Sequence, residues 1–167
     1  MLKLSQVSKS FDDRSLLRNI SFEIKRGERV SFLSPGGAGK STLLKILLGL
    51  IKPDGGDVEL LGHSVFSIVE KKRLNLMRRV GVAFQQEALF DFMTVMNNIL
   101  FAMEHMTNKS KKDMHSRCQE LLKEVKLPNA HNLFPYELSG GMKRRVGVAR
   151  ALCTDPEIAF LMNPLQV

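Results

Sequence analysis

The chain has 167 residues, of which 44% are hydrophobic and 25% are charged, so it is long enough for one domain with a hydrophobic core. Its two cysteines form neither a disulfide framework nor a metal-binding pattern, and its longest apolar run, residues 46–51, is far too short to span a bilayer. The net charge of +8 leaves nucleic acid, an anionic membrane surface or phosphate ligands open. No aromatic residues interleave with the scattered basic residues, which argues against nucleic acid as the main partner.

The first half of the chain alternates strand and helix signals. Half-buried strands are indicated where apolar and polar residues alternate, and buried strands where a short run is wholly apolar. Leucines and isoleucines at helical spacing indicate a helix that a Pro-Asp-Gly-Gly turn ends. The expected elements are strands at 2–7, 20–24, 30–33, 58–61 and 80–84 and helices at 40–50 and 70–77.

Residues 86–136 lose the strand signals and gain helical ones. Ser110 followed by Asp113 resembles a capping box and predicts the start of a helix there. Another helix is expected at 140–152, and a last buried strand at 158–161. Alternating strands and helices with an inserted helical segment predict an α/β fold with a mainly parallel core sheet.

A glycine-rich segment separates the strand predicted at 30–33 from the helix predicted at 40–50. Glycines at such a junction let backbone N–H groups turn toward phosphate oxygens, and the helix N-terminus adds positive partial charge. Lys40 can then reach the β- and γ-phosphates, and the Ser41 hydroxyl can ligate Mg²⁺. This P-loop is compatible with kinases, GTPases, helicases and transporters. Its residues are Ser34, Pro35, Gly36, Gly37, Ala38, Gly39, Lys40, Ser41 and Thr42.

Ser34 occupies the first glycine position of the P-loop pattern. If that position needs a positive φ, serine strains the loop by about 1–3 kcal/mol and weakens phosphate binding without abolishing it. The alternative to a P-loop is a chance glycine turn. A preceding strand and a following helix, which is the context that the chemistry needs, disfavour that alternative.

A second predicted helix N-terminus carries the five-residue motif Leu138, Ser139, Gly140, Gly141 and Met142. The motif and the helix behind it resemble the signature of ABC transporter ATP-binding subunits, in which Ser139 and the N–H groups of the two glycines cap a helix that faces a phosphate. The resemblance covers essentially all of the chain. It implies a P-loop NTPase fold with N-terminal antiparallel strands, and a head-to-tail dimer in which each signature meets ATP held by the partner subunit.

The same resemblance assigns further roles and boundaries. Phe11 would stack on adenine, the alternative being a buried phenylalanine in a turn. Gln85 would touch Mg²⁺ or the attacking water, the alternative being a polar strand end. Transmembrane permease subunits would be partners, on the cytoplasmic face of the inner membrane. The implied parts are a core at 1–85 and 136–161, a helical subdomain at 86–135 and a tail at 162–167.

Two segments resemble a narrower subgroup, the Mla-type phospholipid transporters. One follows Gln85, and the other surrounds the signature, where Met142 replaces the usual glutamine. By this resemblance the cargo would be phospholipid, moved between the inner and outer membranes of a bacterium-like cell. The residues that carry it are 85–91, Thr94, Val95, Asn98, Ile99 and 136–145.

The family pattern breaks after the strand predicted at 158–161. Met162 stands where the family has an Mg²⁺-binding aspartate, and Asn163 where it has the catalytic glutamate. A thioether does not replace the hard oxygen ligands that Mg²⁺ prefers. An amide cannot take a proton from water at neutral pH, a role worth ~10²–10⁴-fold in rate. We therefore expect the chain to bind ATP without hydrolysing it.

A shifted reading frame offers an origin for this break. From the last base of the Met162 codon onward, the codons permitted for residues 162–167 include Glu-Pro-Thr-Ala-Gly-Leu-Asp, the family's own sequence at this place. We hypothesise a frameshift just after Leu161, which makes the fold incomplete at its C-terminus. Strands that flank the P-loop strand in this fold come later in the chain, so their loss would leave residues 30–33 with bare edges. A non-hydrolysing partner subunit and an inert remnant of a decaying gene remain alternatives.

Overall fold

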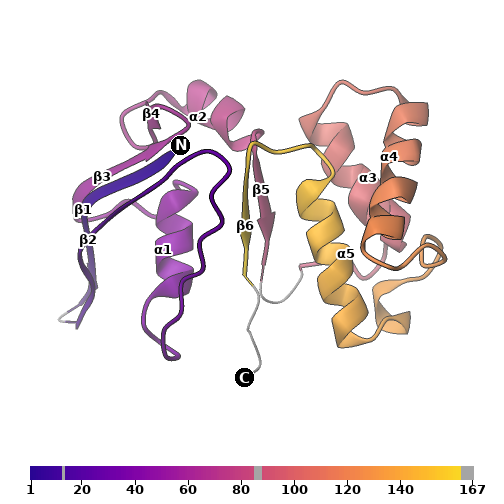
Figure 1. Cartoon of the computed structure of the whole chain (residues 1–167), viewed down its shortest axis with the longest axis horizontal. Helices are drawn as coiled ribbons and strands as arrows, with labels where there is room; N and C mark the ends of the chain where they lie inside the picture. Colours follow the sequence, from indigo (N-terminus) through magenta and orange to yellow (C-terminus); the bar gives the residue numbers. More distant parts are fainter. Residues whose placement is uncertain (13, 85–87, 163–167) are drawn as a thin grey trace. The chain divides into compact units, whose positions relative to one another are not determined.

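The computed structural model describes residues 1–12, 14–84 and 88–162, which form two compact units, Met1–Met77 and Arg78–Val167. Each unit has a β-sheet of its own (Figure 1). The predicted α/β class is confirmed, with antiparallel strands at the N-terminus and helices at 95–124. Parallel pairing among the described residues is confined to the second unit. The division into a core and a helical subdomain stays a prediction.

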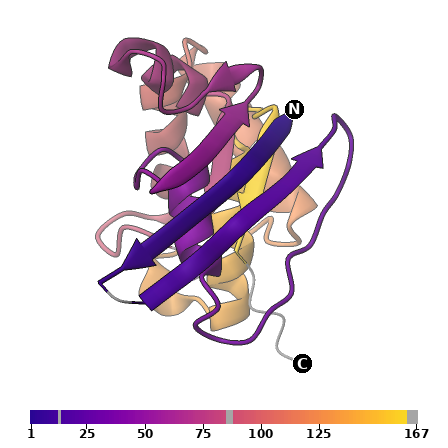
Figure 2. The same ribbon diagram turned by 90° about the vertical axis from the view of Figure 1, so that its left-hand side faces the viewer.

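An antiparallel sheet with strand order β2-β1-β3-β4 dominates the first unit. Figure 2 shows β1 running between β2 and β3. Alternation along β1 buries Leu2 and Leu4, which lie opposite the buried Leu60 and Val58 of β3. Beside this sheet lies helix α1, whose Leu44, Ile46 and Leu47 are buried. The elements are β1 (Leu2–Phe11), β2 (Arg14–Ile24), α1 (Lys40–Leu47), β3 (Gly55–Leu60), β4 (His63–Ser64) and α2 (Glu70–Met77).

Helix α5 organises the second unit. It lies between the parallel pair β5–β6 and the helices α3 and α4 (Figure 1). Its buried Val146 and Ala149 join a hydrophobic cluster with Ile99 and Met103 of α3 and Leu121 of α4. The elements are β5 (Val80–Ala83), α3 (Val95–Met106), α4 (Lys111–Glu124), the short 3-10 turn η1 (Pro135–Glu137), α5 (Gly140–Leu152) and β6 (Ile158–Leu161).

Several sequence-based boundaries are confirmed. The helices predicted at 70–77 and 140–152 and the strand at 158–161 have the bounds of α2, α5 and β6. The predicted cap also forms, since Ser110 Oγ accepts a hydrogen bond from the backbone N of Asp113 at 3.2 Å. Local capping and a clear apolar pattern agree in these segments, which makes such boundaries predictable.

The prediction of a strand at 30–33 is wrong. These residues form no strand, none of the described strands pairs with them, and Leu33 is 78% exposed. The Phe32 ring packs instead against Phe22 of β2, with ring centroids 4.9 Å apart. An apolar run forms a strand only when neighbouring strands satisfy its backbone N–H and C=O groups.

Gly81 fixes how closely α5 approaches β5. A Cβ at this position would collide with the carbonyl oxygen of Ala151 and lie 2.9 Å from Pro156 Cγ. We expect Gly81→Ala to lower the free energy of unfolding by about 1–3 kcal/mol, because a backbone atom cannot move aside as a side chain can. Urea denaturation followed by circular dichroism measures this. Gly55→Ala is the matched control, because a Cβ there meets nothing within 4 Å. Equal stability of the two variants would contradict the packing seen at Gly81.

Both thiols are buried in the second unit. Burial raises the pKa of Cys118 to about 11 and that of Cys153 to about 12, and Cys153 Sγ lies 3.7 Å from the carbonyl oxygen of Ile99. The thiolate is the reactive form, so we expect neither cysteine to react with iodoacetamide at pH 8 while the chain is folded. Mass spectrometry counts the adducts, and a sample in denaturant should gain two. Rapid labelling without denaturant would show that this core is not formed.

Candidate functional site

Helix α1 begins directly after the glycine-rich segment and sets the geometry of the predicted P-loop. Gly39, its N-cap, has φ 93°, a conformation that glycine adopts with little strain. A Cβ at Gly39 would lie 2.9 Å from Leu17 Cδ2 and 3.1 Å from Leu16 Cγ. The backbone conformation therefore favours glycine at this position, and a Cβ would in addition force the two leucine side chains of β2 to shift.

Lys40 folds back onto the loop that precedes it. Its Nζ donates to the carbonyl oxygen of Ser34 at 2.7 Å, to Ser34 Oγ at 2.8 Å and to the carbonyl oxygen of Pro35 at 3.1 Å. Ser34 does not have a positive φ, so the strain considered for serine at this position does not arise. Its hydroxyl gives Lys40 an additional acceptor instead. The ammonium group is thereby held beside the turn that leads into α1.

The first turn of α1 is suited to an anion. It contains no acidic residue, and no side chain caps its backbone N–H groups. Such N–H groups at a helix start need partners and attract negative charge. Gly36, Gly37, Ala38 and Ser41 are exposed, whereas Thr42 is half-buried. The turn can thus accept anionic oxygens, and the Lys40 ammonium adds a positive charge beside it.

An open recess of about 600 Å³ lies at the turn that joins β1 to β2. Phe11, Asp12, Arg14 and Leu16 line it. Phe11 is 45% exposed, so it is not a buried turn residue. Leu16 also meets the Cβ position of Gly39, which makes the recess and the predicted P-loop close neighbours within the first unit. An exposed aromatic ring beside a phosphate loop suits a flat base attached to phosphates.

The predicted signature residues form the N-terminus of α5. Ser139 is the N-cap, and its Oγ accepts a hydrogen bond from the backbone N of Met142 at 3.3 Å. Leu138 is buried in the hydrophobic cluster, whereas Ser139, Gly140 and Gly141 are exposed. A Cβ at either glycine would meet nothing within 4 Å, and the first turn has no acidic residue. This helix start is therefore open to an anionic group.

The parallel strand pair ends at Met162, the position at which the ABC resemblance predicts an Mg²⁺-binding aspartate. One further hydrogen bond, from Met162 N to the carbonyl oxygen of Ala83 at 2.9 Å, extends the pairing beyond β6. The half-buried Met162 therefore stands at the carboxyl end of two parallel strands, where α/β proteins place ligand-binding groups. Its thioether offers no hard oxygen to a metal ion. The predicted site residues Asn163 and Gln85 lie outside the described residues.

Within the part of the chain that the structure describes, no three or more His, Cys, Asp or Glu residues gather in a way that could hold a metal ion. Of the two predicted Mg²⁺ ligands, only Ser41 is described, and it is exposed at the start of α1. A single hydroxyl fits Mg²⁺ that is held mainly by phosphate and water oxygens. No helix in the described ranges is long and apolar enough to cross a bilayer.

Sequence analysis missed the structural role of Asn98. This side chain of α3 is fully buried, and its Nδ2 donates to the carbonyl oxygens of Phe90, Met93 and Thr94 at 3.0–3.1 Å. Its Oδ1 accepts from the backbone N of Phe90 at 2.8 Å. All of its hydrogen-bonding groups are used to fix the segment that leads into α3. A polar residue four positions after the N-cap Thr94, among apolar neighbours, was the available signal.

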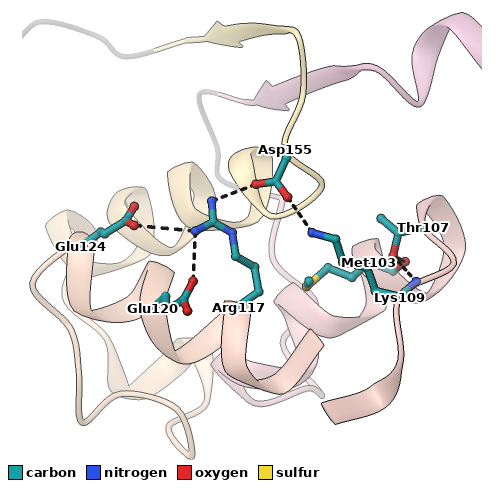
Figure 3. Close-up of polar contacts among 7 residues, drawn as sticks. All are labelled: Met103, Thr107, Lys109, Arg117, Glu120, Glu124 and Asp155. Atoms are coloured by element: carbon teal, nitrogen blue, oxygen red, sulfur yellow. Dashed lines mark hydrogen bonds and ion pairs between the residues drawn. The ribbon is translucent and has the colours of Figure 1, made fainter. Parts of the chain in front are cut away.

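Asp155 ties the turn between α5 and β6 to helix α4 and to the segment that precedes it (Figure 3). Its carboxylate lies 2.6 Å from Lys109 Nζ and 3.0 Å from Arg117 Nη2, and Arg117 also contacts Glu120 and Glu124 of its own helix. The hydrogen bond from Lys109, together with the charge of Arg117, lowers the pKa of Asp155. Exposed ion pairs contribute little stability, at most about 1 kcal/mol each, so this group serves mainly to orient the turn before β6.

Comparison with known protein families matches residues 17–166 to the family described as ABC transporter. Over 164 residues the chain is 38% identical to the spermidine/putrescine import ATP-binding protein PotA of Thermotoga maritima, which covers 98% of this chain and 43% of that protein. It is 37% identical over 171 residues to the protein TRIGALACTOSYLDIACYLGLYCEROL 3, chloroplastic, of Arabidopsis thaliana, which covers 98% and 49%. The chain thus spans less than half the length of these two relatives.

A solved structure agrees with this match. It is the dimeric structure of an ATP-binding cassette in a post-hydrolysis state, bound to ADP and Pi, with a TM-score of 0.86 and 32% sequence identity. The similarity covers 95% of this chain and 72% of that one. The P-loop and the signature helix both fall inside the matched range, and the chain therefore belongs to the ABC transporter family, whose ATP-binding cassette has the P-loop NTPase fold.

Proposed function

We propose that this chain is an ATP-binding subunit of an ABC transporter and binds ATP through its first unit. The phosphates lie along the first turn of α1 and residues 36–39, with Lys40 on the β- and γ-phosphates and Ser41 on the Mg²⁺ ion. Adenine stacks on Phe11. The observation that carries this proposal is the N-terminus of α1, which has no acidic residue and no side-chain cap and holds the Lys40 ammonium beside its loop.

The signature residues serve a second subunit in this proposal. Two cassettes pair head to tail, and the exposed start of α5, from Ser139 to Gly141, faces the γ-phosphate of ATP bound to the partner. Its unblocked glycines and the lack of acidic residues in its first turn support such a contact. The dimeric form of the solved cassette supports the pairing.

The partners would be transmembrane permease subunits, with the cassette on the cytoplasmic face of the inner membrane. Two exposed aromatic residues, Phe92 and Phe101, support a docking surface, and their rings lie 5.7 Å and 5.1 Å from that of the half-buried Phe90. Phospholipid is the proposed cargo, on the resemblance of residues 85–91 and 136–145 to Mla-type transporters. One relative is named for a galactolipid and another for polyamine import. Because these names differ in cargo, the proposal of phospholipid depends on the two local segments alone.

Met162 favours binding without hydrolysis, and hence a second candidate function. The chain would be a non-hydrolysing subunit that lends its signature to a competent partner. The thioether at the end of β6 replaces a carboxylate that would ligate Mg²⁺, and Asn163 replaces the general base. Such a subunit would still complete its partner's ATP site through Ser139–Gly141.

Replacement of Lys40 tests ATP binding. We expect Lys40→Ala to weaken MgATP binding about 10- to 100-fold, because a charge-assisted hydrogen bond to phosphate is worth about 1.5–3 kcal/mol. Isothermal titration calorimetry on the full chain measures this. Lys45→Ala is the matched control, since Lys45 is exposed in the last turn of the same helix. A Lys40 variant that binds MgATP as tightly as the control would contradict the proposal.

The missing carboxylates predict that the chain turns over no ATP. We expect release of phosphate from labelled ATP at the rate of the protein-free control, because the loss of the general base removes ~10²–10⁴-fold in rate. Addition of the chain to a hydrolysing cassette that carries a defective signature should restore turnover, and Ser139→Ala in this chain should abolish that rescue. Turnover by this chain alone that disappears in Lys40→Ala would contradict the non-hydrolysing assignment.

A further inference from the structure

We propose that Lys9 and Asp54 are positioning residues that hold the ring of Phe11 ready to stack on a nucleotide base. The inference rests on the proposed function, because it assigns the recess at Phe11 to the base. Lys9 and Phe11 are two residues apart in β1, so their side chains share one face of the sheet. The Lys9 ammonium lies over the Phe11 ring, 5.4 Å from its centroid, which is within the range of a cation–π contact.

Asp54 fixes the ammonium that meets the ring. Its Oδ1 lies 2.6 Å from Lys9 Nζ, and its Oδ2 accepts a hydrogen bond from the backbone N of Ser10 at 2.7 Å. The backbone N of Asp54 donates to the carbonyl oxygen of Ser8 at 2.9 Å. Asp54, in the turn after α1, thus contacts three successive residues of β1, from Ser8 to Ser10. Only 15% of the Lys9 side chain is exposed, against 48% of the Asp54 side chain, so the lysine is the shielded member of the pair.

This arrangement acts on the ring and not on the phosphates. Phe11 ends a strand and is 45% exposed, and an aromatic side chain in such a place loses rotamer freedom when a base binds. The ammonium restrains the ring before binding and leaves its other face for the base. The Lys9 ammonium already has Asp54 as its counter-ion, whereas Lys40 is the lysine that belongs to the P-loop. Loss of Lys9 should therefore weaken the binding of a base more than the binding of free phosphates.

Two ligands separate a role on the base from a role on phosphate. We would measure the Kd of the full chain for MgATP and for magnesium triphosphate, which has no base, by calorimetry. Lys9→Met should weaken MgATP about two- to fivefold and leave triphosphate unchanged, and Lys9→Arg should keep the wild-type values. Lys3→Met is the matched control, an exposed lysine of the same strand. Unchanged MgATP binding in Lys9→Met, or an equal loss for both ligands, would overturn the inference.

The link through Asp54 is tested by a double-mutant cycle. Asp54→Asn should produce the same selective loss for MgATP, and the double variant with Lys9→Met should lose no more than the larger single effect. Additive losses would show that Asp54 does not act through Lys9.

A second measurement does not depend on nucleotide. The chain has no tryptophan, so Phe11→Trp creates a single fluorescent probe at this place. Removal of the ammonium by Lys9→Met in that background should lower the fluorescence anisotropy and increase quenching by acrylamide, because the ring is released. If neither MgATP nor magnesium triphosphate binds to the wild-type chain, the proposed function fails. If Lys9→Met leaves the anisotropy of the Phe11→Trp variant unchanged, only the inference about Lys9 is overturned.

Discussion

The backbone N–H groups at the starts of α1 and α5 impose the constraint on which this cassette depends. The first turns of both helices lack acidic residues. Gly39 precedes α1, and Gly140 and Gly141 open α5, so no side chain at these positions covers the N–H groups. Unpaired N–H groups at a helix start favour an anionic partner. The two helices thus present two positive ends, which the proposed function assigns to the chain's own ATP and to the ATP of the partner.

Packing and hydrogen bonds position each of these two helices. In the first unit Gly39 lies close to Leu16 and Leu17, and Lys40 Nζ donates hydrogen bonds to three acceptors in the loop. In the second unit α5 buries Val146 and Ala149 in the helical cluster, and its far end packs against Gly81. Close packing of this kind transmits position from one end of a helix to the other. The exposed helix starts are thus attached to helices whose buried residues are packed.

Polar contacts between segments far apart in the chain do the remaining positioning. Asn98 fixes the segment before α3, Asp155 fixes the turn before β6, and Asp54 fixes the end of β1. All three residues lie outside the P-loop and the signature motif. Asn98 and Asp155 were not assigned any such contact from the sequence, because a hydrogen-bond partner dozens of residues away leaves no periodic signal along the chain. The strand predicted at 30–33 failed for the related reason that pairing requires a neighbouring strand, which an apolar run cannot reveal.

The sequence by itself determined the elements with local causes: the helix starts at Lys40, Ser110 and Gly140, the last strand at 158–161, and the P-loop and signature motifs that place the chain in its family. Caps, glycines and apolar periodicity act over a few residues, so they can be read in order along the chain. Tertiary structure alone decided that Ser34 is unstrained and bonded to Lys40, and that Phe11 is exposed in a recess beside Lys9. Those properties depend on which segments meet in space, and burial, pairing and ion contacts arise only when the chain folds back on itself.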